Sequence, residues 1–321
     1  MKSIRKLAFH TSAALLLCAS SLSAQTLSVG TNPQGSLFYA TGTALSGVMS
    51  EETGEQYRVT PFAGSSTYLP LINRGELEFG LTNSGEAVFA FEGREIFDGF
   101  EQENLRVVAV LFPATSGWIV RADSDIRTVA DLEGAKVTSQ FTSGRTFHYL
   151  AGGALAASGL TWEDVQGVPV SGYVAGVDML IDSRVEAAYS TVGVAVARRA
   201  MASINGGIRF LPIDPTGDVD ARIQSSMPTG EAVTLRPTDD NNGIVEDPTT
   251  LTRMYFVLVA GEGTDADDVY ELTKTIFEHK PELASALGAF NRFDTSQMAR
   301  DISVPFHEGA LRFYREAGLI E

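Results

Sequence analysis

The sequence predicts an α/β protein of two lobes. Strand-like and helix-like segments alternate along the chain, which is typical of α/β architectures with largely parallel sheets. Several of the strands run directly into a short loop of small polar residues that precedes a helix. Setting aside the first 24 residues leaves nearly 300, which is enough chain for two domains, each with its own hydrophobic core.

The first 24 residues have the layout of a cleaved secretory signal. A basic start at 2–6 leads into an apolar run over 7–19 and a small-residue exit at 21–24. A retained membrane anchor is the alternative, but the apolar run is too short to span a bilayer comfortably. A lipid on Cys18 is a second alternative, although Leu17 stands where such signals carry a small residue. We therefore expect a periplasmic protein that loses this segment.

The cysteine content and the charge exclude several kinds of site and partner. Cys18 is the only cysteine, so the mature chain has no thiol for a disulfide, a nucleophile or a metal site. All 40 acidic residues but only 21 of the 24 basic residues follow the signal, which leaves a formal charge of −19. Nucleic acid and anionic lipid are therefore poor partners. An anionic ligand would have to be held by local donors against the overall field.

Three strand–loop–helix units open the mature chain. Strands are predicted over 27–30, 57–62 and 77–81, and each ends in a polar loop before a helix with regularly spaced apolar residues. In open α/β sheets the ligand crevice lies at the carboxyl ends of the strands. We therefore expect these loops to face a ligand.

A second set of strands and helices follows a crossover. The apolar segment 105–112 is interrupted at 113–117 and resumes as a strand at 118–121, which predicts a passage into a second lobe. Beyond it, the same patterns predict a strand ending at 141, strands over 165–170, 186–189 and 208–213, and helices over 147–158, 176–182 and 194–204. We expect the last of these strands to return the chain to the first lobe.

The C-terminal part is less regular. The segment 214–250 is rich in Pro, Gly, Asp and Thr, which predicts long loops with short strands. A buried strand over 254–260 and helices over 265–278 and 296–317 complete the chain.

The second lobe is therefore predicted to be an insertion in the first. The first lobe would comprise residues 25–115 and 213–321, and the second lobe residues 116–212. Because the chain would cross between the lobes twice, the two crossovers would form a natural hinge.

Several blocks of sequence, taken in order, resemble one known family. They are Val29-Gly30-Thr31 with the stretch 35–39, then Arg74-Gly75-Glu76-Leu77, Asp131-Leu132-Glu133-Gly134 and the stretch 178–188. Behind a secretory signal, this series is similar to the TAXI-type solute-binding proteins of TRAP (tripartite ATP-independent periplasmic) transporters.

The resemblance implies a two-lobed periplasmic-binding-protein fold of type II, a Venus flytrap with a ligand cleft between its lobes. It also implies capture of a small carboxylate-bearing ligand, such as glutamate, glutamine or another organic acid. The expected partners are this small anionic ligand and the membrane subunits of a TRAP permease, to which a monomeric binding protein would deliver it.

Arg145 is the first candidate for ligand contact. It lies in a Gly-containing turn directly before a predicted helix, where free N–H groups and the helix dipole favour anions. A guanidinium at this place adds a planar pair of donors that matches a carboxylate. The alternative interpretation is a surface arginine paired with one of the many acidic residues.

The other candidates come from the polar loops and the helix starts. They are Asn32, Ser36, Phe38, Tyr39, Ser65, Ser66, Thr67, Asn83, Ser84, Ser143, Thr146, Tyr173 and Val192. Hydroxyl and amide groups would form hydrogen bonds with a ligand, and the aromatic residues would line an apolar wall. Helix capping and core packing are the alternative roles for these residue types.

Two other classes of function stay open at this level. The first is a periplasmic sensor, in which the same clamp reports to a receptor kinase. The second is an exported enzyme, but no two of His148, His279 and His307 stand at metal-ligand spacing, and no nucleophile elbow or phosphate-binding loop is present. We therefore expect binding rather than turnover, with no metal and no cofactor.

Overall fold

The computed structural model describes residues 26–238, 241 and 243–321. The predicted signal at 1–24, with Cys18 and its alternative lipid, lies outside the described residues. In the described part of the chain, no helix is both long and apolar enough to cross a membrane.

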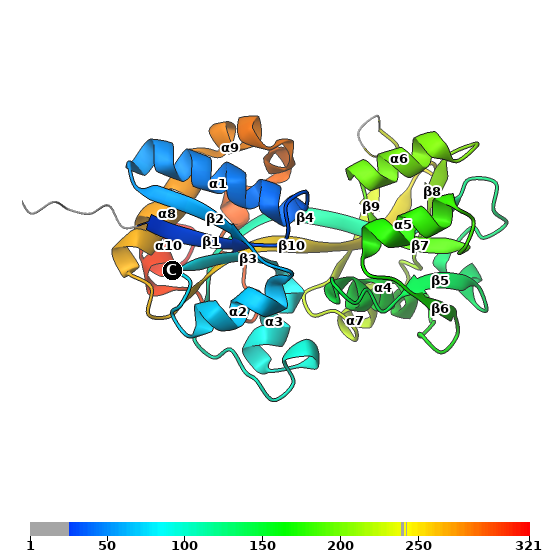
Figure 1. Cartoon of the computed structure of the whole chain (residues 1–321), viewed down its shortest axis with the longest axis horizontal. Helices are drawn as coiled ribbons and strands as arrows, with labels where there is room; N and C mark the ends of the chain where they lie inside the picture. Colours follow the sequence, from blue (N-terminus) through cyan, green and yellow to red (C-terminus); the bar gives the residue numbers. More distant parts are fainter. Residues whose placement is uncertain (1–25, 239–240, 242) are drawn as a thin grey trace, which may run out of the picture.

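The first lobe has three parallel strands with helices on both faces (Figure 1). Its N-terminal elements are β1 (Thr26–Thr31), α1 (Leu37–Thr53), β2 (Gln56–Pro61), α2 (Ser65–Asn73), β3 (Phe79–Asn83), α3 (Ser84–Glu92) and the 3-10 helix η1 (Glu95–Phe97). Its C-terminal elements are α8 (Ala266–Glu278), α9 (Lys280–Ala286), the 3-10 helices η3 (Gly288–Arg292) and η4 (Thr295–Gln297), and α10 (Glu308–Glu316). Leu45, Ile276 and Tyr314 show that α1, α8 and α10 share one buried core.

The second lobe repeats the same architecture on a smaller scale. Its elements are η2 (Val129–Leu132), β5 (Lys136–Ser139), α4 (Thr146–Ala157), β6 (Gln166–Pro169), α5 (Tyr173–Ile181), β7 (Ala187–Thr191), α6 (Ala195–Ser203) and β8 (Ile208–Phe210). Two further elements, α7 (Val219–Gln224) and β9 (Glu231–Leu235), follow β8 in the chain. Buried Leu180 of α5 and Ala200 of α6 belong to the core of this lobe.

Two long strands connect the lobes. β4 (Leu105–Arg121) and β10 (Thr249–Gly261) pair antiparallel and run from one lobe into the other (Figure 1). The strand order is β2-β1-β3-β10-β4-β7-β5-β6, with β8 on β4 and β9 on β10. Parallel pairing occurs within each lobe, as predicted, whereas β4 and β10 pair antiparallel with all their neighbours.

The three N-terminal strands and the helices that follow them are confirmed, but the third pair has no loop, because β3 ends at Asn83 and α3 begins at Ser84. Side-chain caps mark the starts of α1 and α3, whereas α2 has none. The hydroxyl of Ser36 accepts a hydrogen bond from the N–H of Tyr39 (3.1 Å) at the start of α1. The side chain of Asn83 accepts one from the N–H of Glu86 (2.8 Å) at the start of α3. Each helix therefore starts at the carboxyl end of the strand before it, which brings these loops to one edge of the sheet.

The predicted break at 113–117 is wrong, because β4 continues through Pro113. The pairing of β4 with β10 shifts its register between Tyr255 and Val257, next to the position opposite Pro113. Proline has no N–H to give to a strand ladder, and it is tolerated at such an irregularity. The crossover is therefore an uninterrupted strand rather than a loop.

The predicted helix over 296–317 is also too long. In the second half of this range, only α10 is helical. The chain just before α10 runs beside β4, where the N–H of Val107 donates to the carbonyl of Pro305 (2.8 Å). Proline at 305 interrupts helical hydrogen bonding, so the helix begins only after it.

The segment 214–250 contains a helix as well as strands and loops. α7 packs against α4, and β9 pairs with the first part of β10, at Thr249–Arg253. The predicted return to the first lobe at 213 stays a prediction. The packing of α7 and β9 favours a later return, within β10.

Candidate ligand-binding site

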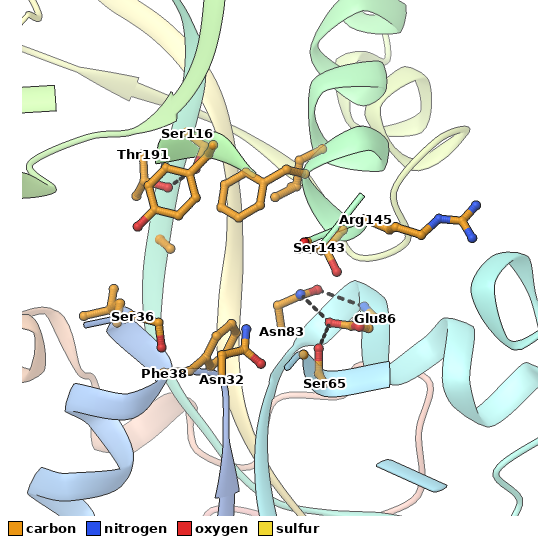
Figure 2. Close-up of a pocket in the computed structure, with 18 of the residues that line it drawn as sticks. Asn32, Ser36, Phe38, Ser65, Asn83, Glu86, Ser116, Ser143, Arg145 and Thr191 are labelled. Carbon is orange, nitrogen blue, oxygen red and sulfur yellow. Dashed lines mark hydrogen bonds between the residues drawn. The ribbon is translucent and has the colours of Figure 1, made fainter. Parts of the chain in front are cut away.

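A cavity of about 170 Å³ lies between the two lobes, in front of the crossing strands (Figure 2). The first lobe contributes Asn32, Ser36, Leu37, Phe38, Gly64, Ser65, Ser66, Asn83, Glu86 and Ile96 to its wall. The second lobe contributes Thr142, Ser143, Gly144, Arg145, Thr146, Phe147, Leu150, Tyr173 and Val194. Strands β4, β7 and β10 add Ala114, Ser116, Thr191, Met254 and Phe256. A molecule in this cavity would contact both lobes at once.

Most of the candidates from the sequence lie on this wall. They are Asn32, Ser36, Phe38, Ser65, Ser66, Asn83, Ser143, Arg145, Thr146 and Tyr173. They converge because every one of them belongs to a strand end or to the loop or helix start that follows it, in one lobe or the other.

Four candidates lie off the wall. Tyr39 faces an outer groove between α1 and α9. Thr67 is exposed in the first turn of α2. Ser84 is fully buried, and its hydroxyl accepts a hydrogen bond from that of Thr229 (2.6 Å). Val192 is partly buried against the second-lobe core, and its N–H donates to a carbonyl of β4. Each follows a residue on the wall by one position, and the backbone turns its side chain elsewhere.

Three helices point their N-terminal ends at the cavity. The residues that precede α2, α4 and α5 are Gly64, Arg145 and Gly172, and none of them provides a side-chain cap. The first N–H groups of a helix have no partner within the helix, and they carry the positive end of its dipole. This part of the wall can therefore donate hydrogen bonds to an anionic group.

Glu86 is a buried carboxyl on the wall. Its Oε2 accepts hydrogen bonds from the hydroxyl of Ser65 (2.7 Å), the hydroxyl of Thr82 (3.1 Å) and the amide of Asn83 (3.2 Å). Burial raises the pKa of the Glu86 carboxyl, and the surrounding hydrogen bonds counteract part of that effect. The hydroxyl proton of Ser65 and one amide proton of Asn83 thus go to Glu86 rather than to the cavity.

Arg145 does not have the orientation that the sequence suggested. Its main chain lies on the wall, but its exposed side chain extends away from the centre of the cavity (Figure 2). In this conformation the N–H donors of the guanidinium do not point at a ligand in the cavity. Among the residues of the wall, Arg145 is the only basic one and Glu86 the only acidic one.

Two stacked pairs of aromatic rings contribute to the apolar parts of the wall. Phe38 stacks on Phe256 with ring centroids 4.4 Å apart, and Phe147 stacks on Tyr173 at 4.7 Å. The hydroxyls of Ser116 and Thr191 form a hydrogen bond of 2.9 Å between β4 and β7 at the back of the cavity. Flat rings on both lobes suit a small organic ligand with an apolar face.

Sequence reasoning missed part of the wall. Ser116, Met254 and Phe256 belong to the crossing strands rather than to loops, and no local pattern marks them. Glu86 had a detectable signal, because an acidic residue three positions after a capping Asn83 is a capping-box pattern. In the described part of the chain, no group of three His, Cys, Asp or Glu side chains could hold a metal ion.

Comparison with known proteins places this architecture. The sequence pattern of the NMT1-like family matches residues 29–318. A solved periplasmic transporter is 15% identical, with 93% of this chain and 94% of that one covered and a TM-score of 0.55. A TctC solute-binding protein from Polaromonas is 12% identical, with 94% and 100% covered and a TM-score of 0.53. The fold is thus the mixed α/β periplasmic-binding-protein fold of type II.

Proposed function

Since this chain belongs to the NMT1-like family, we propose that it is an extracytoplasmic solute-binding protein. It captures a small carboxylate-bearing ligand between its lobes and delivers it to a TRAP-type membrane permease. The predicted secretory signal supports a periplasmic location for this capture. We infer binding rather than turnover, because the wall of the cavity combines hydrogen-bond donors with aromatic rings, which suits the holding of a small ligand.

The observation that carries this proposal is a cavity walled by both lobes at the ends of their strands. A ligand that contacts both lobes favours the arrangement in which they are close together. The lobes are joined by β4 and β10, which supports a hinge at this place. Capture and release would then be the closing and opening of the two lobes.

The proposal that the ligand bears a carboxylate is supported by the N-terminal ends of α2, α4 and α5. The N–H groups of Thr67, Phe147 and His148 already donate to carbonyls, and the remaining first N–H groups of these helices can hold an anionic group without any charged side chain. Arg145 at the rim adds a positive charge close to this place, and a change of its side-chain rotamer would bring the guanidinium nearer to the cavity. Delivery to a TRAP permease is supported by the ordered blocks that resemble the TAXI-type proteins.

A thermal-shift screen with amino acids, 2-oxo acids, dicarboxylates, sugars and polyamines tests the capture. We expect carboxylates to raise the melting temperature, because a ligand at 100 times its Kd stabilises the folded state by about 2.7 kcal/mol. Ser66→Trp should abolish the shift by filling the cavity. Thr67→Trp is the matched control, because the side chain of Thr67 is next in the sequence, is exposed and does not line the cavity.

If only sugars or polyamines stabilised the protein, the proposal of a carboxylate-bearing ligand would be wrong. Mass spectrometry would show whether the bound ligand is consumed, and consumption would contradict the proposal that the protein binds without turnover. Delivery is checked with TRAP permease subunits in proteoliposomes, where uptake of labelled ligand should require this protein. Uptake that proceeds equally without it would contradict the role in transport.

A further inference from the structure

The cavity contains one acidic side chain, Glu86, and none of the described wall residues directs a basic side chain at it. The side chain of Glu86 belongs to the first turn of α3, and the residue is 3% exposed. The donors around Oε2 are neutral hydroxyl and amide groups, and the only arginine of the wall directs its guanidinium away. A carboxylate buried without a cation costs free energy, even when neutral donors solvate it.

Glu86 also keeps capacity for a ligand. The three hydrogen bonds from the first lobe all go to Oε2, and a carboxylate has about four acceptor sites over its two oxygens. Thr146, at the start of α4 in the second lobe, faces the same carboxyl and favours its ionised form. The carboxyl therefore lies where the two lobes meet, which is also where a captured molecule would lie.

Resting on the proposed function, we infer that Glu86 is the counter-ion for a protonated amino group of the ligand. The carboxylate of the ligand would lie at the helix N-terminal ends, and its ammonium group would lie at Glu86. Glu86 is then the residue that selects an amino acid over the 2-oxo acid or the dicarboxylic acid of the same length. The stacked rings of Phe147 and Tyr173 are a further surface that favours a cation.

The pH dependence of affinity distinguishes an ionised Glu86 that binds an ammonium group from a neutral Glu86 that donates a hydrogen bond to a ligand carboxylate. Burial raises the pKa of Glu86 in the ligand-free protein. An ammonium group binds only the ionised carboxylate, so its binding releases the proton from Glu86. Affinity should then rise with pH through that pKa. If a neutral Glu86 instead donated a hydrogen bond to a second ligand carboxylate, affinity would fall with pH. The other titratable groups nearby are Tyr68 of α2, whose pKa is raised by burial and by Glu86, and Arg145.

Isothermal titration calorimetry with matched pairs tests the inference. The probes are L-glutamate with 2-oxoglutarate and glutarate, L-alanine with pyruvate, and L-phenylalanine with phenylpyruvate. For at least one pair we expect the amino acid to bind ten times tighter or more, with release of protons in buffers of different ionisation enthalpy. Glu86→Gln should bring that ratio close to one, and Glu86→Asp should keep a preference for the amino acid.

Glu308→Gln, in the exposed first turn of α10, is the control that should leave every ratio unchanged. If Glu86→Gln does not fold, the wild-type ratios and the direction of proton exchange decide alone. Tighter binding of 2-oxo acids or dicarboxylates, or proton uptake with the amino acid, would overturn the role of Glu86 and leave capture intact. No binding by any probe would overturn the proposed carboxylate capture itself, which is a distinguishable result.

Discussion

At the scale of the residue, Glu86 holds the first-lobe side of the site together. Its carboxyl connects the start of α2 through Ser65, the end of β3 through Thr82, and the cap of α3 through Asn83. Ser65 starts α2, whereas Thr82 and Asn83 are neighbours at the end of β3, and each of these groups would otherwise need its own partner. A buried acceptor shared in this way fixes the positions of residues that line the cavity.

The pH dependence of stability should reveal this carboxyl. Because the pKa of Glu86 is raised in the folded state, the folded state binds a proton more tightly than the unfolded chain. The stability that depends on the protonated form is fully present below the ordinary pKa of glutamate, about 4.3, and is lost as the pH rises through the raised value. Glu86→Gln should remove this loss.

Urea denaturation of the wild type and of Glu86→Gln at several pH values is the measurement. The free energy of unfolding of the variant, relative to the wild type, should increase from pH 4 towards pH 8. A difference that stays constant over this range would show that Glu86 does not titrate differently in the two states.

Arg145 shows how a residue can match a site in sequence and differ in orientation. Its position at the start of α4 is the expected one, and its backbone is part of the wall. The side chain lies elsewhere because nothing in the cavity holds it, and an arginine with several free torsions prefers solvent. Rotamers of this kind depend on partners distant in the sequence.

At the scale of the element, α1 combines a tightly packed face with an open one. Gly42 lies on the buried face, where a Cβ would lie 2.5 Å from Cγ2 of Thr31 on β1. Gly47 lies on the exposed face of the same helix, where a Cβ would meet no atom within 4 Å. Helix and sheet approach closely at the first glycine, and the second has no packing role.

The two glycines make opposite predictions for the same substitution. Gly42→Ala should lower the free energy of unfolding by about 1–3 kcal/mol, because the methyl group must push β1 and α1 apart. Gly47→Ala should raise it by about 0.5–1 kcal/mol, because alanine favours the helix more than glycine does. Urea denaturation measures both, and equal effects in the two variants would contradict this account of the packing.

At the scale of the whole molecule, the lobes are linked behind the cavity as well as through the strands. Glu231 of β9 accepts hydrogen bonds from Arg253 (2.7 Å), from Tyr255 (2.8 Å) and from Arg300 (2.8 Å), which lies between η4 and α10. Met254 and Phe256 face the cavity, so Arg253 and Tyr255 project from the opposite side of β10. This network ties β9 to the C-terminal segment of the first lobe.

Removing the charge of Glu231 should therefore destabilise the whole fold. Its side chain is only 15% exposed, and Glu231→Gln would leave two guanidinium groups without their shared carboxylate. We expect the free energy of unfolding to fall by about 1.5–3 kcal/mol, the range for hydrogen bonds to charged groups. Chemical denaturation at pH 7 provides the measurement.

Glu76→Gln is the matched control for this prediction. Glu76 pairs with Arg74 on the open surface of the first lobe, where solvent screens the interaction. The control should leave the unfolding curve unchanged. Equal curves for the two variants would show that the network behind the hinge contributes nothing.

The sequence by itself determined the alternation of strands and helices, the polar residues at three strand ends of the first lobe and the existence of two crossings. These follow from local periodicity and turn chemistry, which neighbouring residues encode. It also placed Ser65, Asn83 and Ser143 at strand ends, because parallel strands bring their carboxyl ends to one edge.

Only the tertiary structure decided which side chains meet in the cavity. Ser116 and Phe256 reach it from the crossing strands, Glu86 accepts hydrogen bonds from two segments of the chain, and Arg145 turns away from it. It also decided that β4 passes through Pro113 without a break, because β10 offers a register shift beside it. The physical reason is common to all of these, because burial, pairing and rotamers depend on contacts between residues far apart in the chain.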